Sequence, residues 1–233
     1  MVAARKSVHH ELIGVAATST EERLTPPVKP EDLAALLDQM EADGRHDLRL
    51  ATGLIALFGL RPAELAVLTT KGDKLYAGAV KRNIATLAQK AKPPRRCLPL
   101  DIAGREGEGK RLLQLYSSGL VKLPASVLNE ISKVEEKGTF QQVGHAFGQL
   151  LKRYEPWKNL VRSNEGITPY SLRHSWAWRC HVCSNNGLHV RQAAALMGHT
   201  VAVHLKHYGS WVDEASLEAA VERYNEGLVA VDN

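Results

Sequence analysis

Residues 46–68 read HDLRLATGLIALFGLRPAELAVL, and this stretch decides the fold that we expect. Apolar side chains repeat at helical spacing over residues 46–58, and Gly59 follows where a left-handed cap would end a helix. Pro62 suits the first position of a new short helix and disfavours the helical conformation for the residue before it. Arg61 is therefore expected in extended backbone, at a corner between two helices.

Helical patterns also predominate on both sides of this corner. Apolar residues recur at helical spacing in most of the later segments. Two short segments, residues 75–80 and 97–100, instead have strand character and flank a charged stretch that suits a hairpin or loop. We therefore expect a mainly α fold with a small antiparallel β-sheet (α+β). The expected helices cover residues 30–40, 46–58, 62–68, 112–116, 125–134, 140–154, 168–183, 190–196, 201–208 and 213–226.

Length and composition indicate a globular protein. The chain has 233 residues, 44% hydrophobic and 24% charged, and no apolar run approaches the ~18 residues of a membrane span. Its three cysteines cannot make a disulfide framework, so we expect a cytoplasmic protein without membrane contact. Residues 1–29 are interpreted as an arm or linker and residues 30–233 as one domain, whose end, 213–233, is an acidic helix and tail.

The charge is distributed unevenly along the chain. Residues 71–111 hold eleven Lys and Arg against four Asp and Glu, a balance of +7, whereas residues 213–233 have a balance of −5. A basic block of this kind indicates a surface that binds a polyanion, although charge alone fits a solvated loop equally well.

Three short motifs carry candidate chemistry. They are GLRPAEL at residues 59–65, YSLRHS at 170–175, and LMGH at 196–199, followed by Tyr208 nine residues after the histidine. In this order and at this spacing they resemble the catalytic domain of the tyrosine recombinases, the phage-integrase family, over about residues 30–225. The resemblance implies that family's fold and a site-specific recombinase or integrase. Such enzymes cleave and rejoin double-stranded DNA through a 3′-phosphotyrosyl intermediate, without a metal or other cofactor.

The residue types in these motifs suit phosphodiester transfer. Arg61 and Arg173 can neutralise two phosphate oxygens, because their guanidinium groups match phosphate and stay charged. Tyr208 is the candidate nucleophile, which would form a covalent intermediate. His199 could donate a hydrogen bond to the phosphate or handle a proton, and Glu64 could support Arg61.

The resemblance also implies a lysine on a β-hairpin that protonates the leaving 5′ oxygen. Lys81, at the end of the expected strand, is our assignment, and Lys90 and Lys92 in the same basic stretch stay open as alternatives. Contacts to DNA are expected from Lys81, Arg82, Lys90, Lys92, Arg95 and Arg96.

One position departs from the family pattern. Tyr170 stands where the second motif usually has histidine, and a phenol is a far poorer proton acceptor than imidazole at neutral pH. A DNA-binding protein of the same fold with weak or no cleavage therefore stays open, as does a type IB topoisomerase-like enzyme. A plain helical interaction module would leave the motifs as coincidence.

The chain also lacks a second feature of the family. Its members usually carry a separate helical DNA-clamping domain of about a hundred residues, and here only the arm before Pro30 stands in its place. We interpret the chain as an excised catalytic domain or a minimal form. The resemblance further implies a tetramer on paired sites, in which residues 213–233 pack on a neighbouring subunit. The alternative is that this segment folds back as a cap.

Other polar residues near the motifs are interpreted as structural. His174 is expected to be buried and to orient its neighbours, and His204 and His207 to be exposed. Cys180 and Cys183 lie on an apolar helix face without a second ligand pair, so no metal site is expected.

Overall fold

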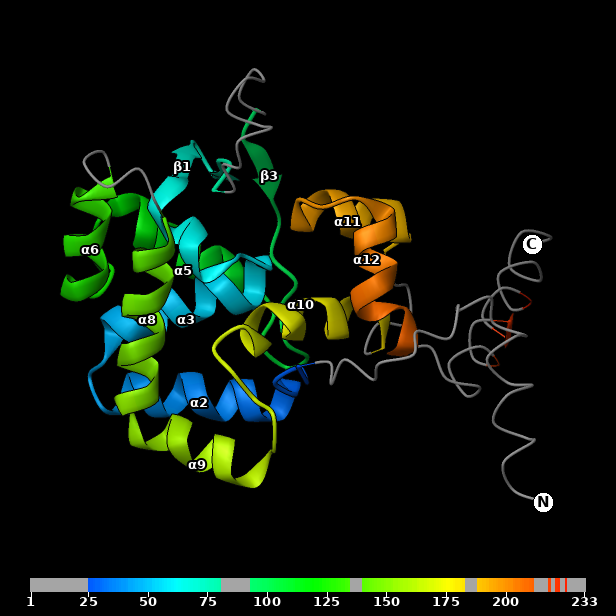
Figure 1. Ribbon diagram of the computed structural model, residues 1–233, viewed down its shortest axis with the longest axis horizontal. Helices are drawn as coiled ribbons and strands as arrows, with labels where there is room; N and C mark the ends of the chain where they lie inside the picture. The colour runs from blue at the N-terminus through cyan, green and yellow to red at the C-terminus, as the bar shows by residue number, and fades with distance from the viewer. Residues whose placement is uncertain are drawn as a thin grey trace.

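A computed structural model describes residues 25–80, 93–134, 140–182 and 188–211, together with positions 218, 221, 222 and 225. The described chain is mainly helical with one small sheet, which confirms the expected fold class (Figure 1). The helices are α2 (Pro30–Ala42), α3 (His46–Phe58), η1 (Pro62–Val67), α5 (Glu108–Ser118), α6 (Ala125–Ser132), α8 (Gln141–Arg153), α9 (Glu155–Ser163), α10 (Ser171–His181), α11 (Val190–Met197), α12 (Val201–Tyr208) and η2 (Gly209–Trp211).

The sheet is antiparallel and has the order β1 (Leu68–Lys71), β2 (Lys74–Ala77), β3 (Arg95–Cys97). Ala77, the last residue of β2, pairs with Arg95, the first residue of β3, so the segment joining the two strands begins and ends at the same end of this strand pair. That segment contains the predicted DNA contacts Lys81, Arg82, Lys90 and Lys92, which lie outside the described residues.

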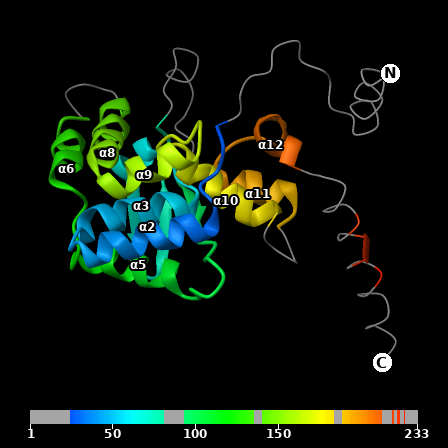
Figure 2. The same cartoon turned by 90° about the horizontal axis from the view of Figure 1, so that it is seen from below.

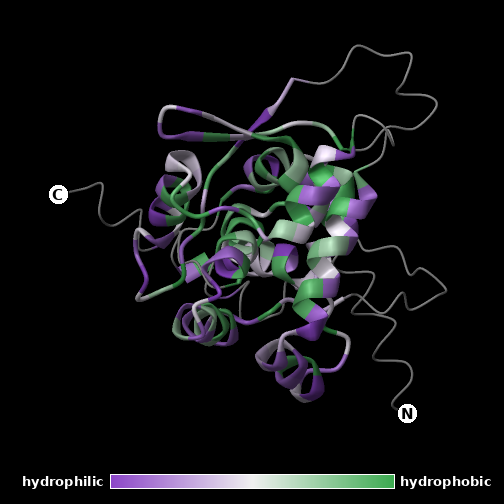
Figure 3. Cartoon of the chain, turned by 90° about the vertical axis from the view of Figure 1, so that its left-hand side faces the viewer, coloured by the Kyte–Doolittle hydropathy of each residue, from purple (hydrophilic) through white to green (hydrophobic). Residues whose placement is uncertain are grey.

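Helix α3 is the centre of the larger core. All its residues from Leu48 to Phe58 are buried, and it packs against α2, α5 and α10. Helix α10 joins this core to a smaller one, because Leu172 belongs to the first while Trp176 packs with residues of α11 and α12. Figures 1 and 2 both place α10 between the main body and the pair α11 and α12. Along the helices of Figure 3, hydrophobic and hydrophilic positions alternate, as amphipathic helices require.

The corner after α3 has the expected geometry. Gly59 takes φ 63° and caps α3, and Arg61 is extended at φ −73°, ψ 143°. A Cβ on Gly59 would lie 3.0 Å from the ring of Trp176 on α10. Glycine therefore permits both the left-handed turn and the close packing of α10 on α3.

Several expected elements differ from the observed ones. Strand β1 begins at Leu68, where a helix was predicted, and β3 covers Arg95–Cys97 instead of residues 97–100. Pairing with β2 determines the limits of both β1 and β3, and such pairing has no local signal in the sequence. A separate helix, α9, follows α8. Helix α10 begins at Ser171 instead of 168, because Ser171 Oγ accepts the N–H of Thr168 (3.0 Å) in a turn.

Two further expectations concern the membrane and the chain end. No helix in the described part of the chain is long and apolar enough to cross a membrane. The predicted helix over 213–226 lies almost wholly outside the described residues.

Candidate active site

The corner between α3 and η1 places the first two groups of the site. Arg61 donates its backbone N–H to Glu64 Oε2 (2.7 Å) and its Nη1 to Glu64 Oε1 (2.8 Å). Its Nη2 donates to the carbonyl of Gly198 (3.3 Å). The Arg61 side chain is 19% exposed, whereas that of Glu64 is 2% exposed. Arg61 is thus held from behind by a buried carboxylate and can still meet a ligand at the surface.

Arg95 on β3 holds the same carboxylate from the other side. Its Nη1 and Nη2 donate to the two oxygens of Glu64 (3.0 and 2.8 Å), and its Nε donates to the carbonyl of Leu196 (2.9 Å). These three hydrogen bonds favour an internal, clamping role for Arg95 over the DNA contact that was predicted for it. Arg96, the next residue, is exposed and fits a DNA contact.

Glycine at position 198 makes this clamp possible. Gly198 has φ +71°, and a Cβ there would lie 2.8 Å from Cδ and Nε of Arg95. The turn between α11 and α12 can therefore rest directly on the Arg95 side chain. This turn carries His199. Arg95 therefore connects the sheet both to Glu64 and to the turn that holds His199.

Glu64 is ionised despite its burial. Burial alone would raise the pKa of its carboxyl group, but Arg95, Arg173 and Arg61 together lower that pKa below its ordinary value. A carboxylate at this position balances part of the charge of three arginines, which could not otherwise lie so close together.

Arg173 occupies the deepest position. Its side chain is 1% exposed, it donates to the carbonyls of Gly59 and Met197, and its Nη1 lies 3.9 Å from Glu64 Oε2. Burial and the charge of Arg61 lower the pKa of Arg173 from its ordinary value. Helices α3, α10 and α11 thus fix this guanidinium in one orientation.

Tyr208 lies at the end of α12 and is 4% exposed. Its hydroxyl is 3.1 Å from Nδ1 of His174 on α10. Burial raises the pKa of Tyr208 to about 12, although Arg173 opposes the rise. Burial and Arg173 lower the pKa of His174 to about 4. At neutral pH both groups are uncharged, so the phenol can donate its hydrogen bond to the imidazole.

His199, in the turn before α12, also meets another histidine. Its Nε2 lies 2.8 Å from Nδ1 of His204, whose Nε2 lies 2.6 Å from Nε2 of His181. The prediction that His204 is exposed was wrong: the residue is 1% exposed. His204 lies four residues before Tyr208 and so on the same helix face, which is a signal that the sequence already contained.

Tyr170 lies at the edge of the site. It is 40% exposed, and its ring meets that of His174 edge-on at 5.0 Å between centroids. His174 is buried, as expected, and His207 is exposed, as expected.

The structure brings together six of the predicted site residues from η1, α10, the turn after α11, and α12. They are Arg61, Glu64, Arg173, His174, His199 and Tyr208, with Tyr170 beside them. Sequence reasoning missed the clamping position of Arg95 and the burial of His204. The position of Arg95 depends on strand pairing and has no local signal. Lys81 lies outside the described residues.

A metal site is not found among the described residues, where no three His, Cys, Asp or Glu side chains gather in the manner of a metal-binding group. Cys180 is buried in the smaller core, and Cys183 lies outside the described residues. The spacings of 2.6 and 2.8 Å between histidine nitrogens are hydrogen-bond distances.

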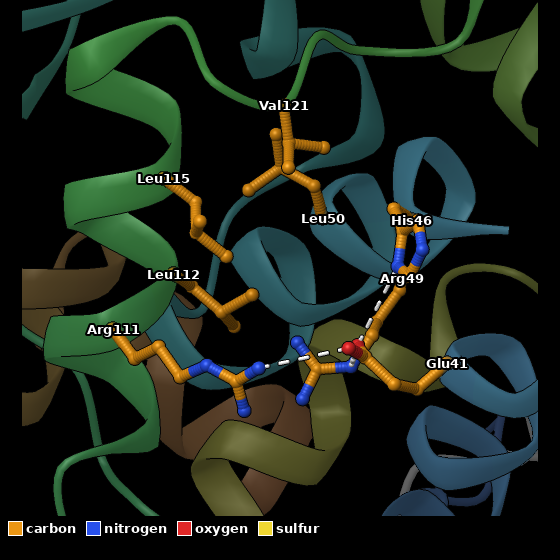
Figure 4. A pocket seen from close by; sticks show the side chains of 8 residues that line it. All are labelled: Glu41, His46, Arg49, Leu50, Arg111, Leu112, Leu115 and Val121. Atoms are coloured by element: carbon orange, nitrogen blue, oxygen red, sulfur yellow. Dashed lines mark ion pairs between the residues drawn. The ribbon is translucent and has the colours of Figure 1, made fainter. Parts of the chain in front are cut away.

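A separate hollow of about 220 Å³ lies by α3 and α5 (Figure 4). Leu50, Leu112, Leu115 and Val121 form its apolar wall. Its two arginines, Arg49 and Arg111, pair with carboxylates of Glu41 and Glu108, so the charges of the hollow are balanced within the fold.

Comparison with known proteins finds distant relatives. No family model matches the chain. The chain is 27% identical over 168 residues to Excisase A of Nostoc sp., a match that covers 70% of this chain and 31% of that protein. The chain thus spans about a third of the length of this relative.

Two solved structures align with most of the chain, each with a TM-score below 0.5. The crystal structure of XerA recombinase matches with a TM-score of 0.47 and 14% identity, over 92% of this chain and 68% of that chain. The XerH site-specific recombinase bound to palindromic difH substrate, a post-cleavage complex, matches with a TM-score of 0.49 and 15% identity, over 91% of this chain and 56% of that chain.

Proposed function

We propose that this chain is the catalytic domain of a tyrosine recombinase that cleaves and rejoins DNA through a 3′-phosphotyrosyl intermediate. The observation that carries the proposal is the buried hydroxyl of Tyr208, which is hydrogen-bonded to His174 and lies in the field of Arg173 and Arg61. A nucleophilic oxygen beside two fixed guanidinium groups suits attack on a phosphodiester.

The two arginines have different parts in this proposal. Arg61 is partly exposed, so it can bind a phosphate oxygen as DNA arrives. Arg173 is enclosed and fixed by two carbonyls, so its charge acts on the phosphate without a change of conformation. Glu64 and Arg95 hold this arrangement from behind. Because the arginines supply the positive charge, we propose that the reaction needs no metal or other cofactor.

Bond formation and proton loss are coupled at Tyr208. With a pKa near 12 for the phenol and near 4 for His174, the free protein keeps the proton on Tyr208. As Tyr208 Oη forms its bond to phosphorus, the phenol proton moves to Nδ1 of His174 and the bond from phosphorus to the 5′ oxygen breaks. Lys81 is our candidate for protonating that 5′ oxygen, with Lys90 and Lys92 as alternatives.

A second candidate function is DNA binding without cleavage. Tyr170 favours it, since a 40% exposed phenol replaces the imidazole that the family uses at this position. In either case the partner is double-stranded DNA, contacted by exposed Arg96 and the basic segment before it. We further propose assembly as a tetramer on paired sites, with residues 213–233 packed on a neighbouring subunit.

A nicked-duplex assay tests the proposed cleavage. The full chain is incubated with nicked duplexes of randomised sequence, in which the fragment beyond the cut diffuses away and traps the adduct. We expect a covalent adduct on a denaturing gel from the wild type and none from Tyr208→Phe. DNA binding stays nearly unchanged, because the substitution removes one oxygen and no positive charge.

Tyr76→Phe, on β2, is the matched control and should form as much adduct as the wild type. An adduct that persists in Tyr208→Phe would move the nucleophile elsewhere, with Tyr224 the next candidate. Binding by the wild type without any adduct would favour the second candidate function.

A further inference from the structure

Three histidines form a continuous hydrogen-bonded chain beside Tyr208. His204 is the middle member: Nδ1 meets His199 Nε2 at 2.8 Å, and Nε2 meets His181 Nε2 at 2.6 Å. The rings are nearly perpendicular, at 71° and 72°. The 1% exposed His204 therefore has both ring nitrogens bonded to other histidines. His181 at the end of α10 is only half-buried.

The surroundings keep these three rings uncharged near neutral pH. Burial is the main cause that lowers the pKa of His199 to about 3 and that of His204 to about 4, and it also lowers that of His181. The charged or titratable neighbours act in the same direction. Those that face the chain are Arg173 from α10, Arg61 from the corner before η1, and His207 from α12; the ring of Tyr208 also packs against His204.

A neutral imidazole carries one N–H, so a chain of three has two possible orders. In one, each ring donates toward His181, and His199 keeps an unprotonated Nδ1. In the other, each ring donates toward His199, and His199 keeps an Nδ1–H. Since Nε2 of His199 is already bonded to His204, Nδ1 is the nitrogen left to meet a ligand.

We propose that the chain runs toward the active site: His181 donates to His204, His204 donates to His199, and His199 offers Nδ1–H to the scissile phosphate. This inference rests on the proposed function, because the phosphate oxygens accept hydrogen bonds and an unprotonated Nδ1 would repel them. His204 and His181 are positioning residues in this arrangement. They set the tautomer of His199 and do not touch the phosphate themselves.

A spectroscopic test needs no DNA cleavage. Histidine side chains are labelled with ¹⁵N in the full chain, and the tautomers are identified at neutral pH from long-range ¹H–¹⁵N correlations. We expect His199 with its proton on Nδ1 and His204 with its proton on Nδ1. His204→Leu should leave His199 as a mixture of tautomers. A proton on Nε2 of His199 in the wild type would overturn the proposal.

A pair of variants then connects the tautomer to the reaction. His204→Asn places an amide nitrogen close to the original Nδ1 and can still donate to His199, whereas His204→Leu fills similar space without a donor. We expect the leucine variant to form adduct about tenfold more slowly, the effect of one ordinary hydrogen bond on a barrier, and the asparagine variant to recover most of the rate.

The pH dependence separates positioning from mere packing. Loss of the donor frees Nε2 of His199 to take up a proton, so the pKa of His199, followed through its ¹⁵N shifts, should rise in His204→Leu. His145→Leu, at an exposed position on α8, is the control and should match the wild type. Equal loss of rate in the leucine and asparagine variants, with an unchanged pKa of His199 in the leucine variant, would overturn the proposal. If the wild type forms no adduct, the proposed function fails, while the tautomer measurement still decides the order of the chain.

Discussion

Neighbouring arginines on β3 should respond to substitution in opposite ways. Both Arg95 and Arg96 were expected to contact DNA, but in the structure Arg95 is bonded to Glu64 and Arg96 is exposed. We therefore compare Arg95→Leu with Arg96→Leu. The first should destabilise the protein and the second should weaken DNA binding.

The magnitude for Arg95→Leu follows from the carboxylate that it abandons. Removing one partner of a buried ion pair costs about 3–5 kcal/mol. Glu64 keeps Arg61 and, at 3.9 Å, Arg173, so we expect the lower end, about 3 kcal/mol, or roughly 6–12 °C in Tm for a chain of this size. Arg96→Leu should change the unfolding free energy by less than about 0.5 kcal/mol, as is usual for surface substitutions.

The sign of the pH dependence is fixed by Glu64. Its pKa in the folded protein is lowered from 4.5, so it contributes stability above pH 4.5, and this contribution is lost as the pH falls toward the folded pKa. Arg95 is the largest of the lowering influences. The difference in stability between the wild type and Arg95→Leu should therefore be greatest near pH 7 and shrink below pH 4.5.

Two assays check this prediction. Denaturant unfolding at pH 7 and pH 4 gives the free energies, and DNA binding at several salt concentrations gives the salt slope. Arg96→Leu should reduce that slope by about 0.9, the value for one phosphate contact, while Arg95→Leu leaves it nearly unchanged. Wild-type stability together with a reduced salt slope in Arg95→Leu would refute the interpretation of Arg95 as an internal clamp.

Three further predictions concern the site itself. Tyr170→His should keep or raise the rate of adduct formation on nicked DNA, because imidazole exchanges protons near neutral pH; a large fall would show that the pocket is adapted to tyrosine. Gly198→Ala should lower the unfolding free energy by about 1–2 kcal/mol, because its φ of +71° is strained for alanine and the new Cβ would meet Arg95; wild-type stability by denaturant unfolding would contradict this. Adduct formation should persist in a metal chelator, and loss of activity that magnesium restores would contradict the proposed part of the arginines.

Local patterns predicted most of the helices and the identity of the central site residues. The corner at Arg61 could be predicted because Gly59 and Pro62 act on the backbone of their immediate neighbours. Helix α12 was also predicted with its observed limits, 201–208, and in the structure the side chain of Thr200 caps it. In each case the deciding interaction lies within a few residues in the sequence.

Long-range contacts decided what the sequence left open. Arg95 and Arg96 are adjacent and chemically identical, and only the pairing of β3 with β2 turns the first toward Glu64. His181 and His204 are 23 residues apart, and their hydrogen bond exists because α10 and α12 pack together in the smaller core. Residue types and short-range spacing thus determined which side chains are candidates for the site. Which charges are buried, and which groups touch, depended on contacts between distant segments, whose energies no local pattern encodes.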